Sequence, residues 1–313
     1  MTFPFSRPFF GLFLVCLFCF ALSLLIGCGS GGGGLFTESV PTLTPAEQAE
    51  VDKYIANSGR DSLIRYLSDE SRKDTDEKLV LKYVKYFVAQ GADVNAKDSD
   101  HWNNDMTPLE FAVRCGDVEM VKFLVSKGAD IDDSLRSAAS AGHLEVVKFL
   151  VSTGANVDDP KPLNSAASAG HLEVVKYLVS KSDHFSGAFA LHEAIRGDHL
   201  DVIDFLVSKG VDVNAEVRGG FRNYTGSALH IAADVGNLKI AEYLVSKGAN
   251  VNSRNMWGDF PLHFASDNHL EVVKFLISKG ADVDVKNRDG QTALDIARKK
   301  ENADIVKYLS DLK

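Results

Sequence analysis

The most regular feature of this chain is an amphipathic pattern that returns many times. In the segment LEVVKFLVS (144–152), apolar residues recur with the spacing of one helix face, and Glu145 and Lys148 fall on the polar side. A Gly-Ala-Asp or Gly-Ala-Asn phrase follows most such segments and predicts a helix end followed by a turn. The predicted buried face of this helix consists of Leu144, Val147, Leu150 and Val151.

These segments belong to a series of related units. The residues SAASAGHLEVVKFLVS (137–152) return as SAASAGHLEVVKYLVS (165–180), with a single change, Phe149 to Tyr177. Such self-similarity predicts a stack of repeated units, because one helix pair buries its apolar face only against a near copy. The same helix position recurs in eight units, at Phe87, Leu124, Leu150, Leu178, Leu206, Leu244, Leu276 and Leu309.

Two phrases recur in order within these units. The first is TPLEFA (107–112), which returns as SALHIA (227–232), FPLHFA (260–265) and TALDIA (292–297). The second is GHLEVV, at 142–147 and 170–175. Together they resemble the ankyrin repeat over roughly residues 80 to 313. The resemblance implies an all-α ankyrin solenoid of about 7–8 units over 81–313, with short β-hairpin fingers.

The units differ in length. Those containing Leu150, Leu178 and Leu206 lack residues between helix pairs, which predicts shortened fingers. A later unit carries the insertion EVRGGFRNYTG (216–226), and one residue is missing from the turn near Asn268. Short fingers flanked by longer ones predict a notch along the concave side of the stack.

The first 34 residues have a different character. Arg7 precedes an uncharged apolar run over 8–26, which is long enough for a membrane-spanning helix and also typical of an export signal. The phrase Leu25-Ile26-Gly27-Cys28 resembles the lipobox of bacterial lipoproteins. That resemblance implies a signal peptide over 1–27, with lipid on Cys28 and a flexible tether over 28–43. An uncleaved anchor is the alternative.

By the same resemblance, the residue after the cysteine bears on location. Gly29 stands where an Asp commonly retains lipoproteins at the inner membrane. We therefore expect a cell-envelope lipoprotein facing the periplasm or cell surface, with the outer membrane favoured if the organism has one.

A helical cap or divergent repeat is expected over 44–80. Thr44 suits the position before a helix, Pro45 suits its first turn, and Glu47 completes a capping box. Terminal units of repeat arrays are usually atypical, because one of their faces meets water.

Composition narrows the classes of function. The net charge of −9 supplies no basic face for nucleic acid. Of the four cysteines, two leave with the predicted signal peptide and Cys28 carries lipid, so Cys115 has no disulfide partner within the mature chain. We expect a monomer whose fold is held by packing.

The residues with catalytic or metal-binding chemistry are largely accounted for by the repeats. Seven of the nine histidines occupy repeat positions, where we expect them to hydrogen-bond neighbouring loops. The acidic pairs at 132–133 and 158–159 fall in predicted turns, and no phosphate-binding, nucleophile or metalloprotease motif occurs. We therefore predict no enzyme activity, no cofactor and no metal site.

Exposed positions that the repeat does not dictate remain as candidates for partner binding. Tryptophan, tyrosine and arginine are the residue types most enriched in binding hot spots. For Trp257, packing on a neighbouring finger is the alternative to partner contact, and the insertion is a binding loop or a plain loop. The candidates are Trp102, Arg114, Arg136, Arg196, Arg218, Phe221, Arg222, Tyr224, Asp234 and Trp257.

The predicted function is that of a non-enzymatic protein-interaction module tethered by lipid to the bacterial envelope, with another envelope protein as its partner. Two alternatives stay open. One is a rigid structural spacer without a specific partner, and the other is an inhibitor or protector of an envelope enzyme.

Overall fold

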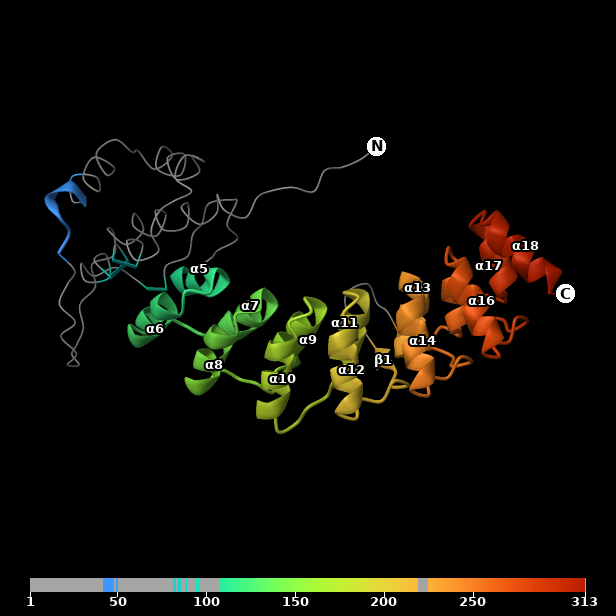
Figure 1. The fold of residues 1–313 in the computed structure, drawn as a ribbon, viewed down its shortest axis with the longest axis horizontal. Coiled ribbons are helices and arrows are strands. Elements are labelled where there is room, and N and C mark those ends of the chain that lie inside the picture. Colours follow the sequence, from blue (N-terminus) through green and yellow to red (C-terminus); the bar gives the residue numbers. More distant parts are fainter. Residues whose placement is uncertain are drawn as a thin grey trace. The chain divides into compact units, whose positions relative to one another are not determined.

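The computed structural model describes residues 42–47, 49, 81, 82, 84, 85, 88, 94, 95, 107–218 and 225–312. These residues lie mostly in helices joined by turns (Figure 1). The chain forms two compact units, Met1–Ala138 with Glu145–Ala155, and Ala139–Leu144 with Asn156–Lys313. The predicted signal peptide, Cys28, nearly all of the tether and most of the predicted cap lie outside the described residues.

The first unit contains a helix pair, α5 (Pro108–Cys115) and α6 (Val118–Ser126), which contact each other. The hydroxyl of Thr107 accepts a hydrogen bond from the amide of Glu110 (3.2 Å) and caps α5, whose first residue is a proline. Gly116 ends the helix in the left-handed region at φ 74°, which glycine adopts without steric cost. Thr107 and Pro108 of the recurring phrase thus set the start of α5, and Gly116 sets its end.

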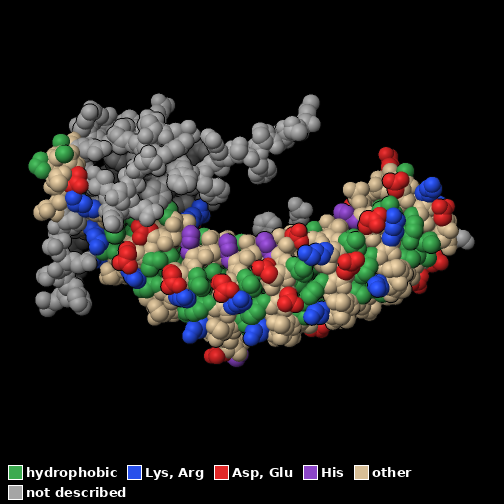
Figure 2. Space-filling model, in the orientation of Figure 1, with side chains coloured by type: hydrophobic (Ala, Val, Ile, Leu, Met, Phe, Trp, Pro, Cys, Tyr) green, Lys and Arg blue, Asp and Glu red, His purple; other side chains and the backbone are tan. Residues whose placement is uncertain are grey.

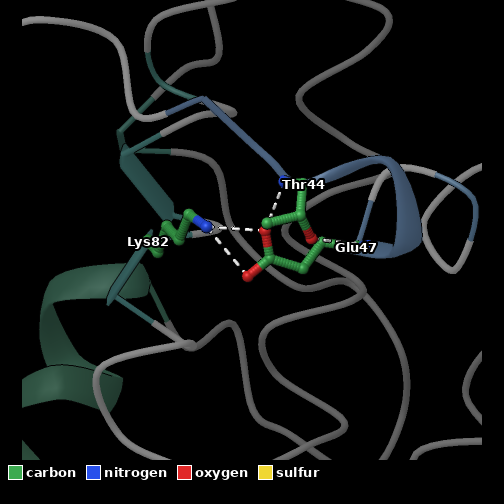
Figure 3. Close-up of polar contacts among 3 residues, drawn as sticks. All are labelled: Thr44, Glu47 and Lys82. Atoms are coloured by element: carbon green, nitrogen blue, oxygen red, sulfur yellow. Dashed lines mark hydrogen bonds and ion pairs between the residues drawn. The ribbon is translucent and has the colours of Figure 1, made fainter.

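The capping box predicted at Thr44 is confirmed. The amide of Thr44 donates to Oε2 of Glu47 (2.6 Å), and the amide of Glu47 donates to the Thr44 hydroxyl (3.3 Å). Lys82 binds the same carboxylate at 2.8 and 2.6 Å from its two oxygens (Figure 3). The hydrogen bonds from Lys82 and from the Thr44 amide lower the pKa of Glu47. Two segments 35 residues apart in sequence are thereby joined.

Helices α7 (Ser134–Ala141) and α8 (Leu144–Ser152) follow, and the boundary between the compact units runs through them. In α8 the fully buried apolar side chains are Val146, Val147 and Leu150. The predicted face is therefore partly wrong, since Leu144 and Val151 are half-buried. A helix within a stack is covered on more than one side, so a single apolar stripe describes its burial incompletely.

The second unit is built from two rows of helices (Figure 1). In one row each helix contacts the next: α9 (Pro160–Ser168), α11 (Ala188–Arg196), α13 (Ala228–Val235), α15 (Pro261–Ala265) and α17 (Ala293–Lys299). The other row comprises α10 (Leu172–Lys181), α12 (Leu200–Ser208), α14 (Leu238–Ser246), α16 (Leu270–Ser278) and α18 (Ala303–Asp311). The recurring leucine of this row is 0–2% exposed in every helix, so the repeats share one apolar core.

Histidines connect three of the repeats, each to the repeat before it. The ring Nε2 of His171 lies 3.1 Å from the carbonyl of Ser140, and that of His199 lies 3.1 Å from the carbonyl of Ser168. His269 makes the same contact with the carbonyl of Asp234 at 3.0 Å. The prediction that repeat histidines hydrogen-bond the neighbouring repeat is confirmed for these three, but each carbonyl lies in the last turn of a helix and not in a loop.

The connections between helix pairs differ in length as predicted. Residues 153–159 join α8 to α9 and 182–187 join α10 to α11, whereas 209–227, 247–260 and 279–292 join the later pairs. Within the longest connection, β1 (Val217–Arg218) pairs antiparallel with β2 (Thr225–Gly226). The predicted notch spans both compact units and stays a prediction.

Candidate functional site

The connection between α14 and α15 is a finger whose backbone is organised by Asn255. Its side-chain Oδ1 accepts hydrogen bonds from the amides of Trp257 and Asp259, both at 2.9 Å. The amide of Gly258 donates to the Asn255 carbonyl, and the Asn255 amide donates to the Asp259 carbonyl, again at 2.9 Å. Asn255 is only 5% exposed. One buried amide side chain therefore fixes the turn that carries Trp257.

The connection between α16 and α17 repeats this design with Asn287. Its Oδ1 accepts from the amides of Asp289 (3.1 Å) and Gln291 (3.0 Å). Its Nδ2 donates to a carboxylate oxygen of Asp259 at 2.9 Å, which links the two fingers. The two tips thus form one prefolded surface.

Two apolar side chains project from the first of these fingers. Trp257 is 51% exposed and Met256 is 38% exposed. Exposed tryptophan on a rigid turn is typical of a binding hot spot, because a large apolar area is offered at little cost in side-chain entropy. This pair is the strongest candidate for partner contact among the described residues.

Buried histidines hold the bases of the fingers. Nδ1 of His263 accepts from the amide of Phe260 (3.0 Å), so its Nε2 carries the proton and donates to the carbonyl of Gln291 (3.1 Å). His230 makes equivalent contacts with the amide of Ser227 (3.1 Å) and the carbonyl of Asp259 (3.2 Å). Burial lowers the pKa of both rings, that of His230 to about 4. Both are neutral anchors near pH 7.

Four other predicted residues lie on the first helices of their units. Arg114 on α5 and Arg136 on α7 are exposed, and Arg114 pairs with Glu110 at 3.1 Å. Arg196 on α11 is half-buried and pairs with Glu193 at 3.4 Å, while Asp234 on α13 is half-buried. Helices α11 and α13 contact each other, so Arg196 and Asp234 lie on neighbouring helices.

The remaining candidates cannot be assigned a contact. Arg218 lies in β1, but its side chain is outside the described residues, as are Trp102, Phe221, Arg222 and Tyr224. Cys115 is exposed. On the face drawn in Figure 2, acidic and basic side chains are interspersed along the helices of the second unit.

Sequence reasoning missed Met256, which precedes Trp257, and it missed Arg254 and Arg288, whose side chains lie near Gly258. One sequence feature could have pointed to these residues, because the motif Asn-x-x-Gly occurs at 255–258 and again at 287–290. The repeated turn motif predicts two similar fingers, and its variable positions are the ones that reach the tips.

Two absences hold for the described part of the chain. No group of three or more His, Cys, Asp or Glu side chains there is arranged to hold a metal ion. No helix there has both the length and the apolar character needed to cross a bilayer.

Helix pairs stacked in two rows, with fingers between them, define a helical-repeat solenoid. The family model described as ankyrin repeats (3 copies) matches residues 75–134, 135–217, 183–255 and 229–313. The chain belongs to the ankyrin-repeat family, which confirms the fold predicted from its recurring phrases.

Solved structures agree with this assignment. The crystal structure of the human ASB11 ankyrin repeat domain is 25% identical in sequence, with a TM-score of 0.56, and the match covers 65% of this chain and 98% of that domain. Since 494 solved chains match, the fold alone does not single out a partner. No curated protein matches the sequence significantly.

Proposed function

We propose that this chain is a non-enzymatic protein-binding scaffold, held at the bacterial cell envelope by lipid on Cys28, and that its partner docks on the fingers between α14 and α17. The observation that carries this proposal is the exposed Trp257 on a turn fixed by the buried Asn255. Membership of the ankyrin-repeat family supports protein binding in general.

The hydrogen bonds within and between the fingers favour specific binding. Association is opposed by the ordering of loops and side chains at the interface, so a surface that is ordered before binding loses less entropy. Here the Asn255 and Asn287 turns are linked by the hydrogen bond from Asn287 to Asp259. The partner would meet a preformed pair of tips with an apolar centre.

The tether is supported by the sequence alone. The lipobox-like phrase 25–28 follows an apolar run and precedes a glycine-rich stretch. Several acyl chains on one cysteine give stable anchoring, since each buried CH₂ contributes about 0.8 kcal/mol. Such a tether would keep the repeat domain close to the membrane, where it would bind an envelope protein.

Photo-crosslinking in the producing cell tests the docking proposal. We would place a photoreactive phenylalanine analogue at position 257, and in a matched variant at Lys239, which is exposed on α14. The proposal expects a discrete covalent adduct with a second protein from position 257 and none from position 239. Absence of any adduct at 257 would favour the spacer interpretation, and adducts of equal yield at both positions would indicate non-specific proximity.

A further inference from the structure

Two arginines from successive fingers converge on Gly258. A Cβ atom built at residue 258 would lie 2.9 Å from Cγ of Arg288 and 3.0 Å from Nη2 of Arg254. The end of the Arg254 side chain and the stem of the Arg288 side chain therefore both lie against this glycine, which directly follows the exposed Trp257 in the chain. Gly258 has φ +81°, a backbone conformation that glycine adopts readily.

This arrangement is held by the finger backbone. Arg254 precedes the Asn255 turn, and Arg288 follows Asn287, whose side chain is bound to Asp259. The amide of Arg288 also lies 3.4 Å from the carbonyl of Trp257. The backbone that carries each arginine is thus held, with Nη2 of Arg254 and Cγ of Arg288 both near Gly258.

Two positively charged side chains meet at Gly258, and the 279–292 connection that carries Arg288 also contains three aspartates. Both arginines and the neighbouring Lys286 are exposed, and within residues 107–218 and 225–312 neither arginine forms an ion pair with a carboxylate. Asp259, which lies in the same finger, is bound by the Nδ2 of Asn287. An anion bound at Gly258 would be attracted by both arginines.

We propose that Arg254 and Arg288 form a clamp for a carboxylate in an acidic segment of the partner protein, with Trp257 and Met256 contacting an apolar residue beside it. A guanidinium matches a carboxylate with two parallel hydrogen bonds, so two guanidinium groups can hold one carboxylate from both sides. This inference rests on the proposed function and names the chemistry of the partner.

The surroundings favour a peptide over a polyanion. The chain carries a net charge of −9, which repels nucleic acid over long range, whereas a single carboxylate needs only the local cation pair. The exposed side chains of Trp257 and Met256 require an apolar group to contact, and a free phosphate or a nucleic-acid backbone offers none. An acidic residue flanked by an aromatic or aliphatic residue satisfies both parts of the site.

Selection from a random 12-residue peptide library displayed on phage tests the clamp even while the partner is unidentified. The full mature chain would be panned in parallel with the double variant Arg254→Gln/Arg288→Gln. A matched control, Lys239→Gln/Lys307→Gln, removes the same charge from exposed positions on α14 and α18. We expect wild type and control to enrich the same peptides, each with an Asp or Glu beside an apolar residue, and the double variant to lose them.

Affinities of an enriched peptide give the quantitative result. Loss of each charged hydrogen-bonding partner should weaken binding roughly tenfold or more. Replacing the acidic residue of the peptide by its amide should produce the same loss in wild type and little further loss in the double variant. Peptides with free and amidated C-termini distinguish a side-chain carboxylate from a terminal one, and a phosphoserine in place of the acidic residue tests a phosphate as the occupant.

Several results would overturn the clamp. In the selection, they are enrichment of peptides without acidic residues and absence of enrichment over the double variant. In the affinity measurements, they are equal binding by the double variant and the control, and tighter binding of the phosphoserine peptide. If the crosslinked envelope partner still binds the double variant at full strength, protein binding stands and only the clamp fails.

Discussion

At the scale of single residues, Asn255 sets the shape of a whole finger. Its Oδ1 accepts two amide hydrogen bonds in a buried position, at 2.9 Å each. Asn255→Ala leaves both amides without this acceptor, and we expect the free energy of unfolding to fall by about 1–3 kcal/mol. Urea unfolding measures this loss. Asn255→Asp keeps an acceptor oxygen and should lose less, so equal losses in the two variants would contradict the assigned role.

Two buried histidines make stability depend on pH. Burial lowers the pKa of His192 and of His230 to about 4, from an ordinary value of 6.5. Because the folded pKa lies below the unfolded one, the stabilisation is complete above pH 6.5 and is lost as the pH falls toward 4. We expect the protonation of each histidine to lower the free energy of unfolding by roughly 3 kcal/mol at pH 4.

A comparison of His192→Asn with wild type isolates the contribution of His192 to the pH dependence of stability. Urea unfolding at several pH values between 7 and 4.5 should show a shallower decline for the variant. If both proteins lose stability in parallel, His192 does not titrate as its burial implies.

At the scale of one element, α8 allows a matched test of packing. Leu150 is fully buried, whereas Lys148 pairs with Glu145 at 2.7 Å on the exposed side. Leu150→Ala should lower the free energy of unfolding by about 2–5 kcal/mol, as for other buried leucines. Lys148→Ala should change it by less than about 0.5 kcal/mol. Comparable losses in urea unfolding of the two variants would contradict the assigned helix face.

The elements themselves could be predicted from sequence, because each repeats a phrase with its own start and stop signals. In α5, Thr107 is the cap, Pro108 is the first helical residue and Gly116 ends the helix. Burial of Val146 was missed, since it depends on a neighbouring helix pair rather than on the helix's own periodicity.

The site was less predictable for a similar reason. Trp257 stood out by residue type. Arg254 and Arg288 become candidates only because the fold brings their side chains, from two successive fingers, close to Gly258. A sequence gives the spacing of two turns but not the direction in which their side chains extend. The repeated Asn-x-x-Gly motif was the available clue to that juxtaposition.

At the scale of the whole molecule, the proposed tether separates anchoring from folding. Cys28→Ala should abolish incorporation of radiolabelled fatty acid and block maturation of the signal peptide. The repeat domain should melt at an unchanged temperature, because residue 28 lies well before the matched repeats, which begin at residue 75. If the wild-type protein incorporates no fatty acid, the lipoprotein prediction is wrong.

Docking of a protein partner on the fingers around Trp257 is tested most directly by an affinity measurement. The quantity is the affinity of this chain for the partner captured by crosslinking. Isothermal titration would compare wild type with Trp257→Ala and with Leu312→Ala, which truncates another exposed apolar side chain, 47% exposed against 51% for Trp257. We predict that Trp257→Ala weakens binding by at least about 2 kcal/mol while Leu312→Ala binds like wild type. Equal affinities for all three proteins would contradict the account.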